Sequence, residues 1–282
     1  MTNARRPRVA EKPPPERRTR PRSDEGWPTG ITSIQPNEIV VRGYSLDELM
    51  GRLGFGEAVY LLLMGELPTP SIGKMFGAVL VSSIDHGVTP PSTLAARNVA
   101  TSGAPLRDAV AAGLLGFGPY LGGDVEACMR FLDEGLVLRR DGMSYERAAG
   151  QIVASYDASQ LPPGFGHRFH TRDPRAARLL QMAHELELEG EHCLMLRAVE
   201  RVLEIDRDPA PPVNVDGAIA AVCGDLGFDP ELGNGLYIIS RLPGLIAHAR
   251  EEHTRHKPLR QIDQTHAYYD GPPRRRLPET RK

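Results

Sequence analysis

The sequence predicts an all-α protein, and three observations support that fold class. Apolar residues recur at helical spacing through most of the chain. Strict alternation of apolar and polar residues, which is typical of half-buried strands, is nearly absent, so few strands are expected. Prolines and glycines separate the helical stretches, as at Pro90-Pro91, Pro162-Pro163-Gly164 and Pro209 to Pro212.

The helices are expected in the following order. The first follows Ile39-Val40-Val41 and starts at Ser45, where Ser45-Leu46-Asp47-Glu48 has the pattern of a capping box. The second runs through Ala58 to Leu63 and stops at Gly65, and the third covers about residues 71–84. Further helices are expected at about 92–101, 105–116, 122–135, 144–158, 173–188, 191–205, 216–226 and 231–253.

The composition is that of a globular protein with two unusual ends. The chain has 282 residues, of which 40% are hydrophobic and 25% charged, enough to bury a sizeable core. Residues 1–25 are rich in Arg and Pro and are expected to form a disordered tail. We expect a helical domain over residues 26–270 and a C-terminal tail over 271–282 that wraps over a surface or a partner chain.

Charge, hydropathy and cysteine usage exclude several classes of function. A net charge of -2 argues against a nucleic-acid-binding protein. No apolar run approaches the roughly 18 residues that a membrane-spanning helix needs. Cys128, Cys193 and Cys223 are scattered and odd in number, which suggests no disulfide framework and favours the cytoplasm.

Three short segments carry the ionisable groups that point to chemistry. They are Ser83-Ile84-Asp85-His86-Gly87, Gly164-Phe165-Gly166-His167-Arg168 and Asn214-Val215-Asp216-Gly217. Two imidazoles and one carboxylate suffice for proton transfer at a carbon next to a carbonyl. Taken singly, His86 also fits a helix C-terminus and Asp216 an ordinary N-cap, so the interpretation as an acid/base enzyme depends on the set.

Arginines near these segments suit an anionic substrate. Arg168, Arg172 and Arg175 surround His167, and Arg241 interrupts an apolar helical stretch. A buried arginine needs an anionic partner, and guanidinium groups bind carboxylates with two hydrogen bonds. A di- or tricarboxylate would suit this set, whereas the other arginines fit a solvated face.

Two other kinds of site are less well supported. His248, His253 and His256 lack the i, i+4 pair of a helical zinc site, so no metal is expected. The glycines around Gly118 and Gly122 follow no strand, which makes them a weak signal for dinucleotide binding.

Taken in order, these segments resemble the citrate synthase superfamily over about residues 43–269. Gly54-Phe55-Gly56-Glu57-Ala58 is similar to an early helix of that family. Asp85-His86-Gly87 and Pro163-Gly164-Phe165-Gly166-His167-Arg168 resemble the segments with its two substrate histidines. Asn214-Val215-Asp216 resembles the segment of its catalytic aspartate. The resemblance implies a large helical domain with a small helical domain at about 144–220.

One departure from the family pattern indicates a subfamily. Where citrate synthases carry a histidine that polarises the thioester carbonyl, this chain has Leu121 in Gly118-Pro119-Tyr120-Leu121-Gly122-Gly123. Citryl-CoA lyases, including the lyase domain of ATP-citrate lyase, are similar to this chain in lacking that histidine. They also share the Asp-His-Gly and Asn-Val-Asp-Gly segments. The resemblance therefore implies cleavage of citryl-CoA to acetyl-CoA and oxaloacetate.

The resemblance also implies the roles of single residues. His86, His167 and Asp216 would be catalytic, and no tightly bound cofactor or metal is implied, because the CoA thioester is the substrate. Gly164, Phe165 and Gly166 would line the CoA end. Substrate carboxylates would be bound by Arg168, Arg175 and Arg241, together with Arg255 entering a neighbouring subunit of a homodimer or tetramer.

Two alternatives remain open at this point. The same residues could serve a citrate or 2-methylcitrate synthase, because microscopic reversibility gives both directions one site. A non-catalytic homologue that binds CoA or a dicarboxylate is an alternative of another class. Such a homologue would keep the arginines without needing Asp216.

Overall fold

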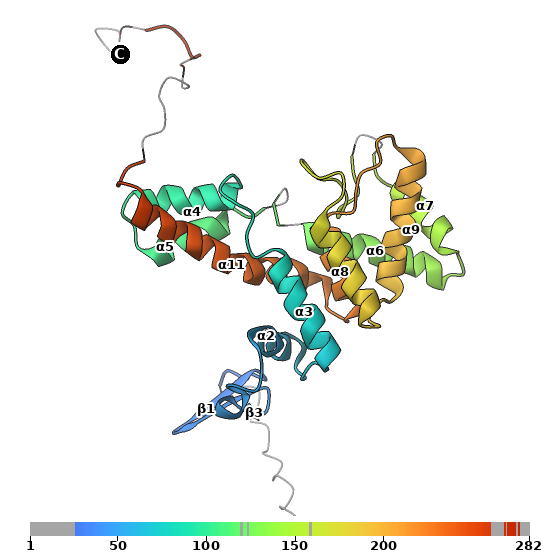
Figure 1. Ribbon diagram of the computed structural model, residues 1–282, viewed down its shortest axis with the longest axis horizontal. Coiled ribbons are helices and arrows are strands. Elements are labelled where there is room, and N and C mark those ends of the chain that lie inside the picture. Colours follow the sequence, from blue (N-terminus) through green and yellow to red (C-terminus); the bar gives the residue numbers. More distant parts are fainter. Residues whose placement is uncertain are drawn as a thin grey trace, which may run out of the picture. The chain divides into compact units, whose positions relative to one another are not determined.

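The computed structural model describes residues 26–118, 121–122, 124–157, 160–260, 268, 270–274 and 276 (Figure 1). The predicted tail at residues 1–25 and most of that at 271–282 lie outside the described residues. The chain divides into two compact units, Met1–Met50 and Gly51–Lys282. The predicted small domain at about 144–220 lies inside the second unit, and its separate status stays a prediction.

The first unit contains a small antiparallel sheet. Its strands are β1 (Thr32–Gln35), β2 (Glu38–Val41) and β3 (Tyr44–Ser45), in the order β1-β2-β3. Asn37 and Arg42, in the two connections, have positive φ angles of 63° and 48°. Tight turns of this kind join strands too short to show alternation in the sequence, which is why the sequence did not predict this sheet.

The predicted capping box at Ser45 is wrong. Helix α1 (Leu46–Leu49) has only four residues, and the Ser45 side chain makes no capping hydrogen bond. Its hydroxyl instead donates to the carboxylate of Asp47. The helix ends at Leu49, one turn after it starts, and the apolar residues Met50 and Leu53 lie beyond it.

The second unit is helical, which confirms the predicted all-α class for the globular part of the chain. In the described residues its helices match the predicted ranges to within a few residues. They are α2 (Phe55–Met64), α3 (Pro70–Ser82), α4 (Pro91–Thr101), α5 (Leu106–Leu115), α6 (Asp124–Arg140), α7 (Tyr145–Ala154), α8 (Pro174–Glu185), α9 (Glu191–Asp206), α10 (Val215–Asp225) and α11 (Pro230–Arg255).

Side-chain caps explain where several of these helices begin. The Asn214 side chain accepts from the Gly217 amide at 3.0 Å, and Asp173 accepts from the Arg175 amide at 2.9 Å. Each bond satisfies an amide that has no partner inside its own helix. Thr69, Ser144 and Asp229 cap α3, α7 and α11 in the same way.

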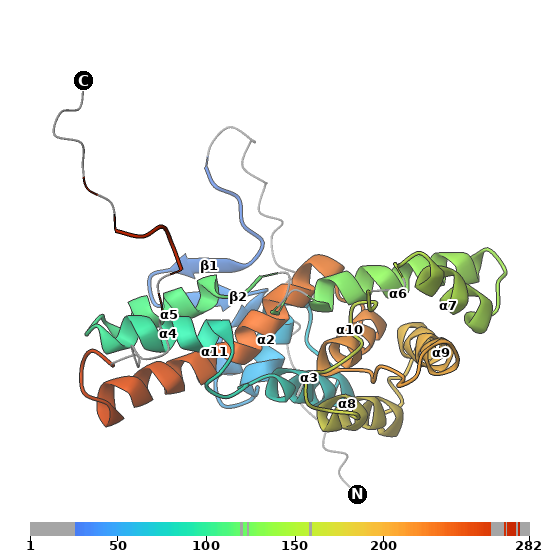
Figure 2. The same ribbon diagram turned by 90° about the horizontal axis from the view of Figure 1, so that it is seen from above.

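Helix α10 lies at the centre of the second unit. Almost all of its residues from Val215 to Cys223 are buried, as expected for a helix that is apolar on every side. Helices α6, α8 and α9 pack around it (Figure 2). This packing holds the N-terminal turn of α10, and therefore Asp216, inside the protein.

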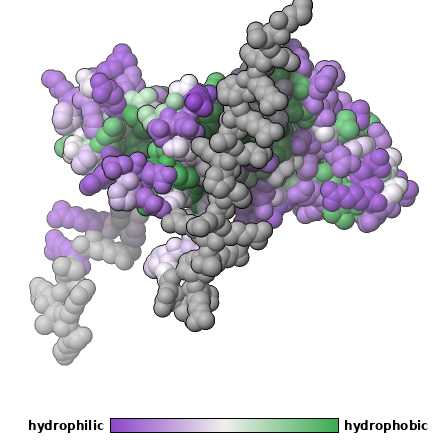
Figure 3. All heavy atoms as spheres, turned by 90° about the horizontal axis from the view of Figure 1, so that it is seen from below, coloured by the Kyte–Doolittle hydropathy of each residue, from purple (hydrophilic) through white to green (hydrophobic). Residues whose placement is uncertain are grey.

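Helix α11 is the longest helix of the described chain and packs on α3, α4, α5 and α6. It continues through Pro243, and its buried face includes Ser240, Arg241 and Gly244. No helix in the described part of the chain is long and apolar enough to cross a membrane. On the face drawn in Figure 3, hydrophilic side chains cover wide areas and hydrophobic ones gather in patches between them.

A histidine with two carboxylates ties α6, α9 and α10 together. His192 Nδ1 lies 3.1 Å from Asp225 Oδ1, and Nε2 lies 3.0 Å from Asp133 Oδ1. Burial lowers the pKa of His192, but the hydrogen bonds to Asp225 and Asp133 outweigh it and hold that pKa above its ordinary value of 6.5. The imidazolium form is therefore stabilised in the folded protein.

This arrangement predicts a pH dependence of stability. A pKa raised on folding stabilises the protein fully below pH 6.5, and this contribution is lost as the pH rises through the higher folded pKa. We expect the temperature of the thermal unfolding midpoint to decrease as the pH rises above 6.5. His192→Gln should make this decrease smaller. Exposed His184, substituted in the same way, is the control; an unchanged slope in His192→Gln would contradict this account.

Candidate active site

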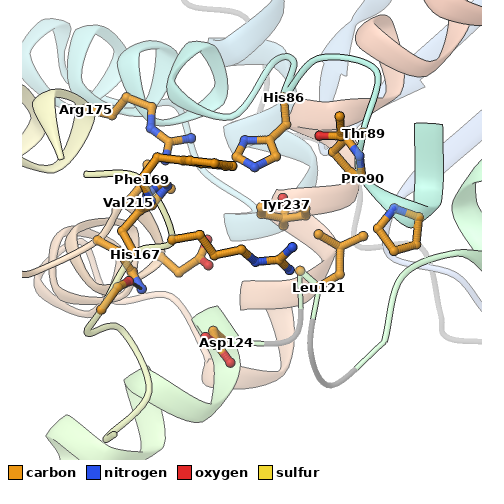
Figure 4. Close-up of a pocket in the computed structure, with 16 residues that line it drawn as sticks. His86, Thr89, Pro90, Leu121, Asp124, His167, Phe169, Arg175, Val215 and Tyr237 are labelled. Atoms are coloured by element: carbon orange, nitrogen blue, oxygen red, sulfur yellow. Dashed lines mark hydrogen bonds between the residues drawn. The ribbon is translucent and has the colours of Figure 1, made fainter. Parts of the chain in front are cut away.

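The three predicted segments meet at one cavity of about 320 Å³. His86, His167 and Asp216 all line it, and Leu121 lies in its wall. In Figure 4 the side chains of His86, His167 and Leu121 surround the same space although they come from three distant parts of the sequence. Arg168 and Arg175 also line the cavity, so the acid/base groups and two of the predicted anion-binding groups share it.

His86 belongs to a loop rather than to a helix end. Helix α3 stops at Ser82, and the Gly87 amide donates to Asp85 Oδ2 at 3.0 Å, which turns the chain around His86. Burial lowers the pKa of His86, and the nearby charges of Arg241 and Arg175 lower it further. The imidazole is therefore neutral at neutral pH, with one nitrogen able to accept a proton.

The backbone fixes the tautomer of His167. Its Nδ1 accepts hydrogen bonds from the amides of Phe169 and His170, both at 3.0 Å. The neutral ring must then carry its proton on Nε2. Burial, followed by the neighbouring His170, lowers the pKa of His167, so the ring stays neutral and Nε2 is a hydrogen-bond donor.

Asp216 is the most perturbed carboxyl of the cavity. It lies in the first turn of α10, but Asn214 is the cap, so Asp216 is free of the N-cap role that the sequence left open. Its Oδ1 is buried and has no hydrogen-bond partner among the described residues. Burial, and after it the charge of Asp124, raises the pKa of Asp216 to about 6, against the opposing charges of Arg175 and Arg241. The group can therefore hold or release a proton near neutral pH.

A close backbone contact positions the His167 loop against α10. Gly164 has a φ of +86°, and a Cβ added there would lie 2.7 Å from the Cα of Gly217. The Asn214 amide donates to the Gly164 carbonyl at 3.0 Å, and the Gly166 amide donates to the Pro212 carbonyl at 2.8 Å. Gly164 and Gly217 are both needed here, because a side chain on either residue would separate the two backbones.

The predicted CoA-binding role of this loop stays a prediction. Gly166 lines the cavity, but its amide is already bonded to Pro212, and Phe165 is buried with 5% of its surface exposed. Gly164 packs on Gly217 and Cys128. These contacts give the three residues a structural function, and any CoA contact must use other atoms than the Gly166 amide.

Asp173 orients Arg175. The guanidinium donates from Nε to Oδ1 at 3.0 Å and from Nη2 to Oδ2 at 2.8 Å, while Asp173 Oδ2 also accepts from the Val215 amide at 3.0 Å. Asp173 is 1% exposed, so this bidentate pair is held rigidly at the start of α8 and α10. Asp173 therefore holds the Arg175 side chain in place in the wall of the cavity.

Arg241 is the largest fully buried side chain of the described residues, with 1% exposure. Its Nε donates to the Ser83 carbonyl at 2.8 Å, and its guanidinium carbon lies 4.8 Å from the centre of the Tyr237 ring. Nη1 and Nη2 are buried without a hydrogen-bond partner in the described structure. A buried cation in this state is disposed to bind an anion, because an unpaired charge is costly to bury.

Arg255 lies away from this cavity, near the C-terminal end of α11, where it pairs with Glu251. The predicted entry of Arg255 into a neighbouring subunit stays a prediction. The histidines near it are bonded separately: His248 to Asp85, His253 to the Ala104 carbonyl and His256 to Arg97. Among the described residues, no three His, Cys, Asp or Glu side chains are grouped as metal ligands.

Sequence reasoning missed Asp124 and Tyr237, which line the cavity from α6 and α11. Asp124 directly follows Gly122-Gly123, where the sequence pointed to Leu121 and to a weak dinucleotide signal but not to an acidic residue. Gly118 and Leu121 exchange backbone hydrogen bonds of 3.0 and 2.8 Å, and Leu121 and Asp124 line the cavity. An acidic residue next to two glycines, near the start of a predicted helix, was the available signal.

Asp124→Asn is predicted to lower the pKa of Asp216. The substitution keeps the size of the side chain and removes the negative charge that, after burial, does most to raise that pKa. The measurement is a ¹³C NMR titration of the Asp216 carboxyl. Glu134→Gln, a charge removal on the same helix outside the cavity, should leave the titration unchanged; an unchanged midpoint in Asp124→Asn would contradict the assigned effect.

Comparison with known proteins agrees with this geometry. The family model of the citrate synthase C-terminal domain matches residues 70–261, which is more than half of the chain. The chain belongs to the citrate synthase family. Among curated relatives, citrate synthase 2 of Bacillus subtilis is 29% identical over 79% of this chain and 58% of its own length. The citrate synthase of Deinococcus radiodurans is 30% identical over 68% and 50%. The chain thus spans about half the length of these relatives.

Solved structures extend the family assignment. A citryl-CoA lyase from Hydrogenobacter thermophilus is 44% identical, with a TM-score of 0.82 over 89% of this chain and 97% of that one. An ATP citrate lyase from Methanosaeta concilii, solved with citryl-CoA, is 21% identical, with a TM-score of 0.71 over 89% of this chain and 43% of its own. The second likeness shows the fold. The resemblance to the citrate synthase superfamily is confirmed, as is the citrate synthase-like fold.

Proposed function

We propose that this protein is a citryl-CoA lyase that cleaves citryl-CoA to acetyl-CoA and oxaloacetate. The observation that carries the proposal is the cavity in which His86, His167 and Asp216 meet beside Leu121. Acid/base groups are present for a carbon–carbon cleavage, while Leu121 offers no proton to a thioester carbonyl. The 44% identity to a citryl-CoA lyase over nearly its whole length supports the same activity.

The reaction we propose begins at the tertiary hydroxyl of citryl-CoA. His86 is neutral and takes the hydroxyl proton, while His167 donates a hydrogen bond from Nε2 to the same oxygen. As the oxygen becomes the ketone of oxaloacetate, the carbon–carbon bond breaks, and its electron pair moves to the acetyl carbon as an enolate. Each acid/base group of this kind contributes typically about 10²–10⁴ in rate.

Asp216 completes the proposed reaction. Its raised pKa of about 6 leaves part of the population protonated near neutral pH, so its proton can be given to the enolate carbon to form acetyl-CoA. The products leave a protonated His86 and an ionised Asp216, and proton exchange with solvent restores both. No proton is created or lost over the cycle.

The arginines would bind the substrate's carboxylates. Arg241 has two unpartnered buried nitrogens, and Arg175 is held by Asp173 with Nη1 outside that pair. Arg168 and Arg175 line the cavity, whereas Arg241 lies next to the lining residue Tyr237, with its guanidinium carbon 4.8 Å from the ring centre. Bound carboxylates would fix the reacting carbon relative to His86 and Asp216, where misplacement by about 1 Å can cost about 10²-fold in rate. A homodimer or tetramer in the cytoplasm remains our expectation for the assembled enzyme.

A citrate or 2-methylcitrate synthase is the second candidate, because the curated relatives named above are citrate synthases. An assay with citryl-CoA tests the lyase directly, with oxaloacetate release followed through malate dehydrogenase and NADH. We expect rapid NADH oxidation. Absence of oxaloacetate release at substrate saturation would contradict the lyase, and binding of CoA without turnover would favour the non-catalytic homologue.

A further inference from the structure

One face of helix α11 holds the loop that carries His86. The Ser240 hydroxyl donates to the Leu80 carbonyl at the last turn of α3, and Arg241 Nε donates to the Ser83 carbonyl. Gly244 and His248 follow on the same side of α11, because residues three or four apart in a helix are neighbours on its surface. Residues 80–85 are therefore contacted by α11 at successive turns.

At Gly244 the loop meets the backbone of the helix itself. A Cβ added at this position would lie 2.5 Å from the Ile84 carbonyl oxygen and 2.8 Å from Asp85 Oδ1. Real side chains do not tolerate such distances, so the loop packs here as closely as a glycine permits. This contact brings Asp85 within reach of the next turn of α11.

His248 occupies that next turn and bonds to Asp85. Its Nε2 lies 3.0 Å from Asp85 Oδ1, and because a carboxylate only accepts, Nε2 carries the proton and donates. The other oxygen, Asp85 Oδ2, accepts from the Gly87 amide at 3.0 Å. The Asp85 carboxylate thus joins α11 to the backbone on the far side of His86.

The support behind His248 is rigid. Its Nδ1 faces Glu251 Oε2 at 4.0 Å, and Arg97 Nη1 donates to that same oxygen at 3.2 Å. Arg97, 5% exposed, also donates from Nε to Glu252 at 2.9 Å. These bonds hold the C-terminal half of α11 against α4. His248 therefore lies on a part of α11 that is fixed in position.

We propose that His248 is a positioning residue for His86, acting through Asp85. Neither His248 nor Asp85 lines the cavity, whereas His86 between Asp85 and Gly87 does. The pair fixes the turn of the loop and thereby the direction in which the His86 imidazole enters the cavity. Its kinetic consequence rests on the proposed lyase function, in which His86 takes the hydroxyl proton.

The kinetic test compares three variants. His248→Ala removes the donor and should lower kcat by about 10–100-fold, the range typical of partners that orient metal-ligating residues, with KM changed less than about threefold. His248→Gln keeps an amide donor at a similar reach and should recover most of kcat. His253→Ala is the control, because His253 lies on the same helix and bonds to the Ala104 carbonyl outside the site.

NMR of ¹⁵N-histidine-labelled protein provides a readout that does not depend on turnover. The His86 ring resonances should shift or broaden in His248→Ala, return in His248→Gln and stay unchanged in His253→Ala. Unchanged His86 resonances with unchanged kcat in folded His248→Ala would overturn the proposal, as would equal impairment of the Gln variant. If neither the unsubstituted protein nor any variant cleaves citryl-CoA, the proposed lyase function is wrong. The NMR comparison alone then decides whether His248 positions His86.

Discussion

Replacement of Asp216 by asparagine is expected to slow citryl-CoA cleavage by about 10²–10⁴-fold without weakening the binding of coenzyme A. The amide keeps the shape of the side chain but has no proton to give to the enolate carbon. Asn214 caps α10, so the fold does not depend on the Asp216 carboxylate. Steady-state kinetics and calorimetric binding of coenzyme A, measured on the same preparation, check both halves of this expectation.

Asp229→Asn is the matched control for Asp216→Asn. Asp229 also stands at the start of a helix, outside the cavity, and asparagine is an equally good N-cap. Its kinetics should match those of the unsubstituted protein. Full turnover by Asp216→Asn would remove Asp216 from the mechanism, and loss of coenzyme A binding would assign it to binding instead.

Arg241→Met is expected to weaken citrate binding while stabilising the unliganded protein. Two charge-assisted hydrogen bonds to a carboxylate are worth about 3 kcal/mol or more, so the dissociation constant should rise by about 100-fold or more. In the empty protein, Nη1 and Nη2 are buried without partners in the described structure, and methionine removes that unpaired charge. Loss of the bond from Nε to the Ser83 carbonyl offsets part of this gain, so the free energy of unfolding should rise by about 1 kcal/mol at most.

Arg97→Met gives the contrasting case. Arg97 is also buried, with 5% exposure, but its guanidinium is bonded to Glu251 and Glu252. Its removal leaves the buried Glu252 with Arg260 and the half-buried Glu251 with Arg255 as remaining partners, and should lower the free energy of unfolding by about 1.5–3 kcal/mol. Chemical denaturation measures the change in the free energy of unfolding for both variants, which should have opposite signs. Destabilisation of Arg241→Met to the same extent as Arg97→Met would show that Arg241 is a structural residue.

Most of the helical fold was predictable because its signals are local. Asp173 and Pro174 mark the start of α8, and Asn214 that of α10, and the structure places both helices within a few residues of the prediction. The small sheet was not predictable from alternation, because strands of two to four residues contain too few positions to show a period. The cap predicted at Ser45 failed for another reason: the Ser45 hydroxyl bonds to the Asp47 carboxylate instead of a helix amide, and α1 ends at Leu49.

The candidate site was predictable where an ionisable side chain lies next to a glycine or proline turn in the sequence. His86, His167 and Asp216 each adjoin or closely follow a glycine or proline turn, and the structure brings them to one cavity. Asp124 was missed because its importance lies in its proximity to Asp216, from a helix about 90 residues earlier. Interactions at such sequence separations, like that of His248 with Asp85, depend on helix packing and leave no local pattern.

The most direct test of the account measures oxaloacetate release and free thiol release in parallel from citryl-CoA. A lyase releases oxaloacetate and keeps CoA as its acetyl thioester, whereas hydrolysis by a synthase releases free CoA and citrate. With Leu121 in the cavity wall, we predict rapid oxaloacetate release and negligible free thiol. Thiol release that equals substrate consumption, with little oxaloacetate, would contradict the lyase assignment.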